Sequence, residues 1–163
     1  MNILMMILRS PRPSRQNDMR AVAMPRWIRK GYDGLTFFGH IITHNAEEAE
    51  AFNACHTLTC GSKNGMLYFK NHEMIHLYQA RATHDSWLCF YWQYMLFWLK
   101  ARGYRRHLKN AGYKLNPFEM EAYANMDNLD YLKPGGKAEG WKRYAAMTLE
   151  ERLKAYQKEI LKR

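Results

Sequence analysis

Residues 72–79 read His-Glu-Met-Ile-His-Leu-Tyr-Gln, in the middle of a segment with the composition of a helix. This segment follows a turn-forming stretch at 60–65 and runs from Met66 to about Arg81 without glycine or proline. Residues four apart lie one turn apart on the same face of a helix. The sequence therefore predicts a helix on which His72 and His76 project side by side.

Two imidazoles at this spacing can bind one metal ion, and zinc takes ring nitrogens at about 2.0–2.1 Å. Glu73 follows the first histidine, so its carboxylate can reach a metal-bound water without ligating the metal. Zinc lowers the pKa of such a water, and a carboxylate then accepts its proton as the water attacks a carbonyl. We predict that His72 and His76 bind Zn²⁺ and that Glu73 is a general base. The alternative is a helix with two surface histidines.

A catalytic zinc site needs a third protein ligand, and several spacings can be compared. A metzincin places glycine three residues and histidine six residues after the second ligand. The chain has Gln79 and Ala82 at these positions, which excludes that pattern. A SprT-like DNA-associated protease takes a later histidine, for which His84 and His107 are the candidates. Neither of them has a spacing that suits the pattern.

Residues 116–125 read NPFEMEAYAN. Together with HEMIHLYQ, this segment resembles small single-domain gluzincin-type zinc metallopeptidases, over roughly residues 35–132. The resemblance implies that a downstream helix supplies a glutamate, Glu121 followed by Ala122, as the third ligand. It also implies a zincin-like fold and a polypeptide substrate. The chain departs from the family at Asn125, where an aspartate usually supports a ligand histidine.

Glu119 and Glu121 diverge by about 200° on a helix, so we do not expect both to face the metal. The motif match favours Glu121. Apolar patterning favours Glu119, whose face continues through Tyr123 and Met126. Because a metal cleft should be polar, we expect Glu121 as the ligand and keep Glu119 as the alternative.

Other polar residues are candidates for supporting roles. Asn125 could accept a hydrogen bond from a ligating histidine, whose second ring nitrogen needs such a partner. The candidates for stabilising an oxyanion are Tyr123 and His40, with His44, Tyr78 and Tyr113 as further possibilities. His40 lies in Leu35–Thr43, which is rich in β-branched and aromatic residues and reads as a strand. We expect the edge of this strand to pair with an extended peptide substrate.

The remaining patterns predict an α+β fold that is mainly helical, with a small β-sheet. Helices are expected at residues 46–54 after Asn45, 66–81, 86–101 after Asp85, 117–132, and 149–161 with a Thr148–Glu151 capping box. Residues 86–101 are aromatic and apolar nearly all round, which predicts a buried core helix. Their apolar run of about 14 residues is too short to cross a bilayer. The alternative is a helix that lies on a membrane surface, helped by the basic residues after it.

The chain has 163 residues and a net charge of +10, which fits one domain with anionic partners. We expect a basic arm at residues 1–30, including a loop at residues 9–20, and a single metallopeptidase domain at residues 31–163. Nucleic acid or a large assembly are the expected partners of the arm. The basic residues gather in two groups: Arg9, Arg12, Arg15, Arg20, Arg26, Arg29 and Lys30, and then Lys100, Arg102, Arg105, Arg106, His107 and Lys109.

Three cysteines, Cys55, Cys60 and Cys89, show no CxxC spacing, which favours a reducing compartment. Residues 1–8 are apolar but too short for a signal peptide, and no transmembrane segment is expected. We expect a cytoplasmic protein of a bacterial or phage-infected cell, with association to a virion or another assembly as the alternative. A second functional hypothesis is a zincin scaffold that binds partners without turnover.

Overall fold

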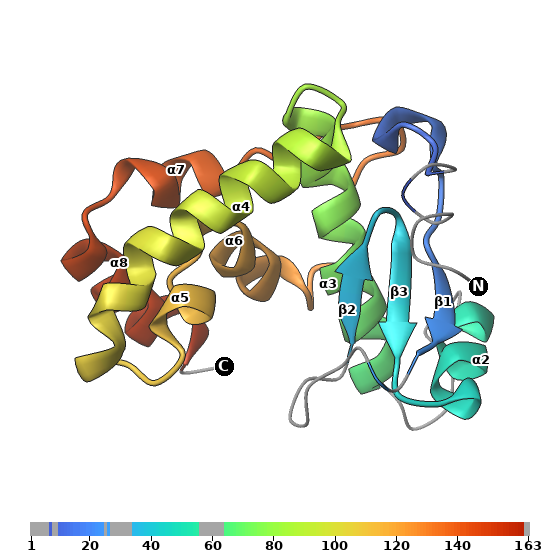
Figure 1. The fold of residues 1–163 in the computed structure, drawn as a ribbon, viewed down its shortest axis with the longest axis horizontal. Coiled ribbons are helices and arrows are strands. Elements are labelled where there is room, and N and C mark those ends of the chain that lie inside the picture. The colour runs from blue at the N-terminus through green and yellow to red at the C-terminus, as the bar shows by residue number, and fades with distance from the viewer. Residues whose placement is uncertain (1–6, 8–9, 25, 27–33, 56–63, 162–163) are drawn as a thin grey trace.

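The computed structural model describes residues 7, 10–24, 26, 34–55 and 64–161. A small sheet lies at one end of the molecule, and helices make up the rest (Figure 1). This arrangement confirms the mainly helical α+β class. The helical elements are η1 (Pro13–Arg15), α2 (Ala46–Ala54), α3 (Asn64–Ala82), α4 (Trp87–Arg102), η2 (Gly103–Arg106), α5 (Ala111–Lys114), α6 (Pro117–Asn125), α7 (Trp141–Ala146), α8 (Leu149–Ala155) and the π-helical η3 (Tyr156–Ile160).

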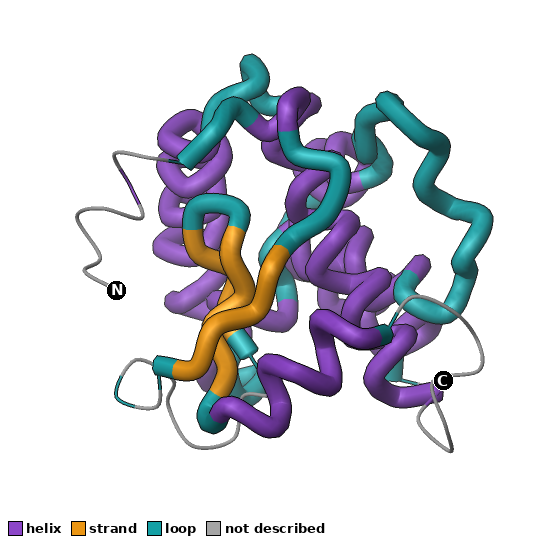
Figure 2. The backbone as a smooth tube through the Cα atoms, turned by 90° about the vertical axis from the view of Figure 1, so that its right-hand side faces the viewer, coloured by secondary structure: helices purple, strands orange, loops and turns teal. Residues whose placement is uncertain are grey.

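The sheet has the strand order β1-β3-β2, and its strands lie side by side in Figure 2. Its strands are β1 (Arg20–Ala23), β2 (Leu35–Phe37) and β3 (His40–Thr43). The single strand expected at residues 35–43 is therefore wrong, because the chain turns back at Phe38 and Gly39. Both have positive φ, 46° and 79°, as in a two-residue type I′ hairpin turn. Strand β2 pairs with β3 antiparallel, whereas β1 pairs with β3 parallel.

Much of the segment expected as an arm is built into the domain. Strand β1 belongs to the sheet, and Met19 just before it is buried. The guanidinium of Arg81 on α3 donates hydrogen bonds to the carbonyls of Pro13 and Gln16. The boundary expected at residue 30 therefore does not separate an arm from the domain in the part that the structure describes. Arg9, Arg29, Lys30 and Cys60 lie outside the described residues.

Several helix signals are confirmed. Asn45 caps α2 by accepting a hydrogen bond from the Glu48 amide, and Thr148 and Glu151 form the expected capping box of α8. The N-cap of α4 is Ser86 rather than Asp85, whose carboxylate instead accepts hydrogen bonds from Ser14.

The helix expected at residues 117–132 stops early, because α6 ends at Asn125. The side-chain amide of Asn71 donates to the carbonyls of Asn125, Met126 and Asn128, and so satisfies backbone acceptors at this end of the helix. These contacts also fix α6 against α3, next to the first histidine of the motif.

Helix α4 is buried on one face only. Trp87 and Phe90 are buried, but Leu88 and Trp92 are 68% and 66% exposed. The prediction that this helix is buried on most sides is therefore wrong. No helix among the described residues is long and apolar enough to cross a bilayer.

Candidate metal centre

Helices α3 and α6 bring two histidines and one glutamate together. Nε2 of His72 lies 3.4 Å from Oε2 of Glu119, and Nε2 of His76 lies 3.6 Å from Oε1 of the same carboxylate. One candidate ligand atom from each of the three residues lies within 4.8 Å of the others. All three side chains are buried. The expected pairing of His72 and His76 on one helix face is present, and a buried His-His-Glu group could hold a metal ion.

Two separations at this group, 3.4 Å to Oε2 and 3.6 Å to Oε1 of Glu119, are close to the spacing that a zinc ion requires. Zinc bonds of about 2.0–2.1 Å in tetrahedral geometry place neighbouring donor atoms roughly 3.3 Å apart. Oε2 of Glu119 is buried and has no hydrogen-bond partner among the described residues. It lies in ion-pair contact with Nε2 of His72. Buried polar atoms are seldom left without a partner. A cation between the imidazoles and this carboxylate would satisfy it.

The charges at the site also favour a cation. Burial lowers the pKa of His72, but its contact with Glu119 and the charges of Glu73 and Glu119 outweigh burial and raise it. Burial raises the pKa of Glu119, but the neighbouring His76 and His72 outweigh burial and lower it. The two effects have one cause, which is that buried carboxylates stabilise positive charge beside them.

Gln79 holds His76 in one orientation. Its side-chain Nε2 donates to the carbonyl of Phe118 at 2.9 Å and to Oε2 of Glu121 at 2.8 Å. Because both partners are acceptors, the amide oxygen of Gln79 must face Nδ1 of His76, 2.8 Å away. His76 therefore carries its proton on Nδ1, and in the neutral ring the lone pair of Nε2 points toward Glu119. This is the form that binds a metal.

Glu121, the ligand favoured from the motif, has other partners. Its carboxylate accepts hydrogen bonds from Gln79, from the Tyr131 hydroxyl at 2.6 Å and from the Gly140 amide at 2.6 Å. It is fully buried and links α6 to α3 and to the start of α7. In the structure Glu119 therefore takes the place expected for Glu121, as the apolar patterning of the helix had indicated.

Asn125 and His40 do not support the site. The side-chain amide of Asn125 donates to the carbonyl of Glu121, one turn back on α6, so the partner of the ligand histidine is Gln79 instead. His40 pairs with Phe37 in the sheet and does not line the cavity beside the histidines. Burial lowers the pKa of His40, which fits a neutral, half-buried strand residue.

A cavity of about 320 Å³ opens beside the metal group. His72 and Glu73 line it from α3, Tyr123 lines it from α6, and Tyr113 and Lys114 line it from α5. Tyr113 and Tyr123 are thus the oxyanion candidates of the sequence analysis that line this cavity. The ring centroid of Tyr123 lies 4.5 Å from that of His72.

Thr36 on β2 orients Glu73. Its hydroxyl donates a hydrogen bond to Oε2 of the Glu73 carboxylate, and both side chains are buried. Glu73 also lines the cavity beside the histidines. Nothing in the sequence near Thr36 indicated its contact with Glu73, because that contact joins residues 37 positions apart.

The free edge of β2 is partly occupied. The Tyr91 hydroxyl on α4 donates to the carbonyl of Thr36 at 2.9 Å and accepts from the amide of Phe38 at 3.0 Å. Thr36 faces Ile41 in the ladder, so its own carbonyl points away from β3. The expected pairing of a peptide with this edge would have to displace Tyr91.

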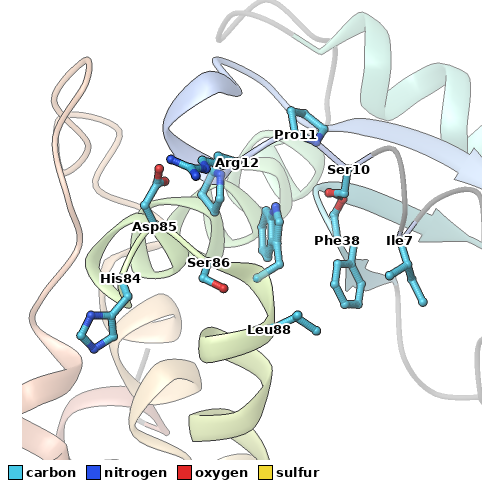
Figure 3. Close-up of a pocket in the computed structure, with 11 residues that line it drawn as sticks. Ile7, Ser10, Pro11, Arg12, Phe38, His84, Asp85, Ser86 and Leu88 are labelled. Atoms are coloured by element: carbon cyan, nitrogen blue, oxygen red, sulfur yellow. Dashed lines mark hydrogen bonds between the residues drawn. The ribbon is translucent and has the colours of Figure 1, made fainter.

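His84 and His107 do not join the metal group. His84 is exposed on the connection between α3 and α4, where it lines a separate cavity with Asp85 and Arg12 (Figure 3). His107 is exposed after η2, and its ring contacts Tyr104. In the part of the chain that the structure describes, the group of potential ligands comprises His72, His76 and Glu119 alone.

Comparisons with protein-family models, curated proteins and solved structures find no match for this chain.

Replacing Gln79 is expected to weaken metal binding. Gln79→Leu removes the acceptor that fixes His76 and leaves the Nδ1 proton without a partner. Loss of such an outer partner typically lowers metal affinity roughly 10- to 100-fold. Zinc affinity measured by competition with a chromogenic chelator tests this. Gln157→Leu, on an exposed residue of η3, is the matched control and should bind zinc like the wild type. Equal affinities for all three proteins would contradict the role of Gln79.

Proposed function

We propose that the chain is a zinc-dependent metallopeptidase, in which His72, His76 and Glu119 bind the metal and Glu73 is the general base. The proposal rests on one observation: a buried His-His-Glu group lies directly beside a cavity that Glu73 also lines. A structural metal site has no need of an additional buried carboxylate at a cavity. A hydrolytic site does, because a water molecule must lose a proton as it attacks.

When bound, zinc would lower the pKa of a water molecule and polarise the carbonyl to be cleaved. The protein supplies the rest. Glu73, oriented by Thr36, accepts the proton of the attacking water and can return it to the leaving amine. Gln79 and Glu121 keep His76 in its metal-binding tautomer. The Tyr94 hydroxyl donates to Oε1 of Glu119 at 2.8 Å and holds the third ligand in place.

Tyr123 and Tyr113 are suited to stabilise an oxyanion. Their hydroxyl oxygens are 3.0 Å apart, and both residues line the cavity. Burial raises the pKa of Tyr123 to about 12, and the charges of Glu119 and Glu73 act in the same direction. Burial likewise raises the pKa of Tyr113 above its ordinary value. Both phenols therefore keep their protons at neutral pH. One proton lies in the hydrogen bond between the two hydroxyls, and the other can be donated to an oxyanion.

The zincin-like fold and the polypeptide substrate belong to the same proposal. A helix with both histidines, a short strand beside it and a second helix with the glutamate are the parts that such a fold needs. The alternative, a scaffold that binds metal without turnover, would leave Glu73 and the cavity without a role. A DNA-associated protease with a third histidine finds no support in the positions of His84 and His107.

Metal removal tests the proposal. The protein, purified without added metal, should carry one zinc per chain and cleave casein or members of a peptide library. Treatment with 1,10-phenanthroline should abolish cleavage, and added Zn²⁺ should restore it. Absence of bound zinc, together with no gain of zinc on addition, would overturn the metal site. Stoichiometric zinc without cleavage of any peptide would favour the scaffold.

A further inference from the structure

The outer face of α4 carries a stripe of exposed apolar side chains. Its members follow the helical spacing i, i+4, i+7, i+8 and i+11 and are Leu88, Trp92, Met95, Leu96 and Leu99. Helix α4 crosses the front of the molecule in Figure 1, and no other helix or strand of the described residues lies in front of it. Leu88 also borders the cavity of about 430 Å³ at the start of the helix (Figure 3). Large apolar side chains that gather on one exposed face mark an interaction surface.

A basic cluster follows this stripe in the sequence. Residues 86–118 include no aspartate or glutamate. The exposed basic residues at the end of α4 and just beyond it are Lys100, Arg102, Arg105, Arg106 and Lys109. The Arg102 guanidinium lies over the Trp98 ring, 5.3 Å from its centroid, so positive charge and aromatic surface meet at this end of the helix.

We infer that this face of α4, from Leu88 to Leu99, docks onto an anionic lipid surface, with the basic cluster on the headgroups. A helix with an apolar face and neighbouring basic residues binds in the plane of the interface, where its apolar side chains enter the headgroup region. Cationic residues near the surface add electrostatic attraction to anionic lipids. With 16 residues, α4 lies on a bilayer rather than crossing it.

A second copy of the chain fits this face less well. Helix α4 is about 24 Å long, and one face about 10 Å wide gives a footprint on the order of 240 Å². A stable protein interface buries about 800 Å² on each partner. Each copy also carries a net charge of +10, which opposes self-association. An anionic membrane instead complements both the apolar stripe and the charge.

Vesicle cosedimentation of the full chain tests this inference. The wild type should bind vesicles of phosphatidylcholine with phosphatidylglycerol far more strongly than vesicles of phosphatidylcholine alone. Trp92→Ser with Leu96→Ser should lower binding at least about tenfold, because the apolar part of the contact is lost. Lys100→Gln with Arg102→Gln should also weaken binding and make it less sensitive to salt.

Two control variants match these changes. Leu129→Ser with Leu161→Ser removes exposed apolar residues outside the stripe, and Lys133→Gln with Lys137→Gln removes two charges elsewhere. Both should bind like the wild type, and circular dichroism should show that every variant is folded. The inference is wrong if the wild type binds neither vesicle, or if the Trp92 and Leu96 variant binds as tightly as the wild type. A dimer in sedimentation velocity that the same variant dissociates would instead identify a second copy as the occupant.

Discussion

Glu119→Gln should lose its bound zinc, whereas Glu121→Gln should keep it. Glu119 faces both histidines within 3.6 Å, and a neutral amide in its place removes an anionic zinc ligand. The expected loss of affinity exceeds the roughly 10- to 100-fold that an outer partner contributes. Zinc per chain, measured after dialysis by atomic absorption, gives the result directly.

Glu121→Gln is the matched control, because it makes the same chemical change two residues away in the same buried helix. It disturbs the hydrogen bonds that Glu121 accepts from Tyr131, Gly140 and Gln79, so its midpoint of thermal unfolding should fall, and its zinc affinity should fall by no more than the roughly 10- to 100-fold that an outer partner contributes. Its zinc content should nevertheless stay near one per chain at saturating metal. If Glu121→Gln loses zinc and Glu119→Gln retains it, the third ligand is Glu121 and the arrangement argued above is wrong.

The histidine pair and the two glutamates differ in how well their positions can be predicted from the sequence. The spacing of His72 and His76 is a local property of one helix, so it could be predicted. The choice between Glu119 and Glu121 depends on how α6 is rotated against α3, and that rotation depends on packing. The apolar face through Tyr123 indicated the glutamate that the structure places beside the histidines, but the motif match outweighed it.

Contacts between segments far apart in the sequence could not be predicted. Thr36 on β2 meets Glu73 on α3 through tertiary packing, and no periodicity in the sequence encodes that contact. The contact between Gln79 and His76 is local and could have been predicted. Gln79 lies three residues after His76 on the same helix face, where a polar side chain can reach Nδ1.

The predictions of a single strand at residues 35–43 and of a helix buried on most sides at residues 86–101 were wrong for different reasons. Gly39 is a recognisable turn residue, but the apolar residues around it read as one continuous strand. Helix α4 is apolar on both faces, and composition alone cannot say that one face meets Phe118 while the other meets solvent. The exposed face is therefore information that only the fold supplies.

Glu73→Gln should retain one zinc per chain and lose hydrolysis. Glutamine has nearly the same shape and still accepts the Thr36 hydrogen bond, but it cannot take a proton from water. Loss of a general base lowers the rate by roughly 10²- to 10⁴-fold. The measurement is kcat on a peptide that the wild type cleaves, with zinc content determined on the same sample.

Two further variants serve as comparisons for Glu73→Gln. Glu50→Gln, an exposed glutamate on α2, should leave both zinc content and kcat unchanged. Thr36→Val removes the hydroxyl that orients Glu73 but leaves the carboxylate, so its kcat should fall less than that of Glu73→Gln. A Glu73→Gln protein that cleaves as fast as the wild type would exclude Glu73 as the base. Loss of zinc from Glu73→Gln would instead show that the carboxylate is needed to hold the metal, because the substitution changes no other group at the site.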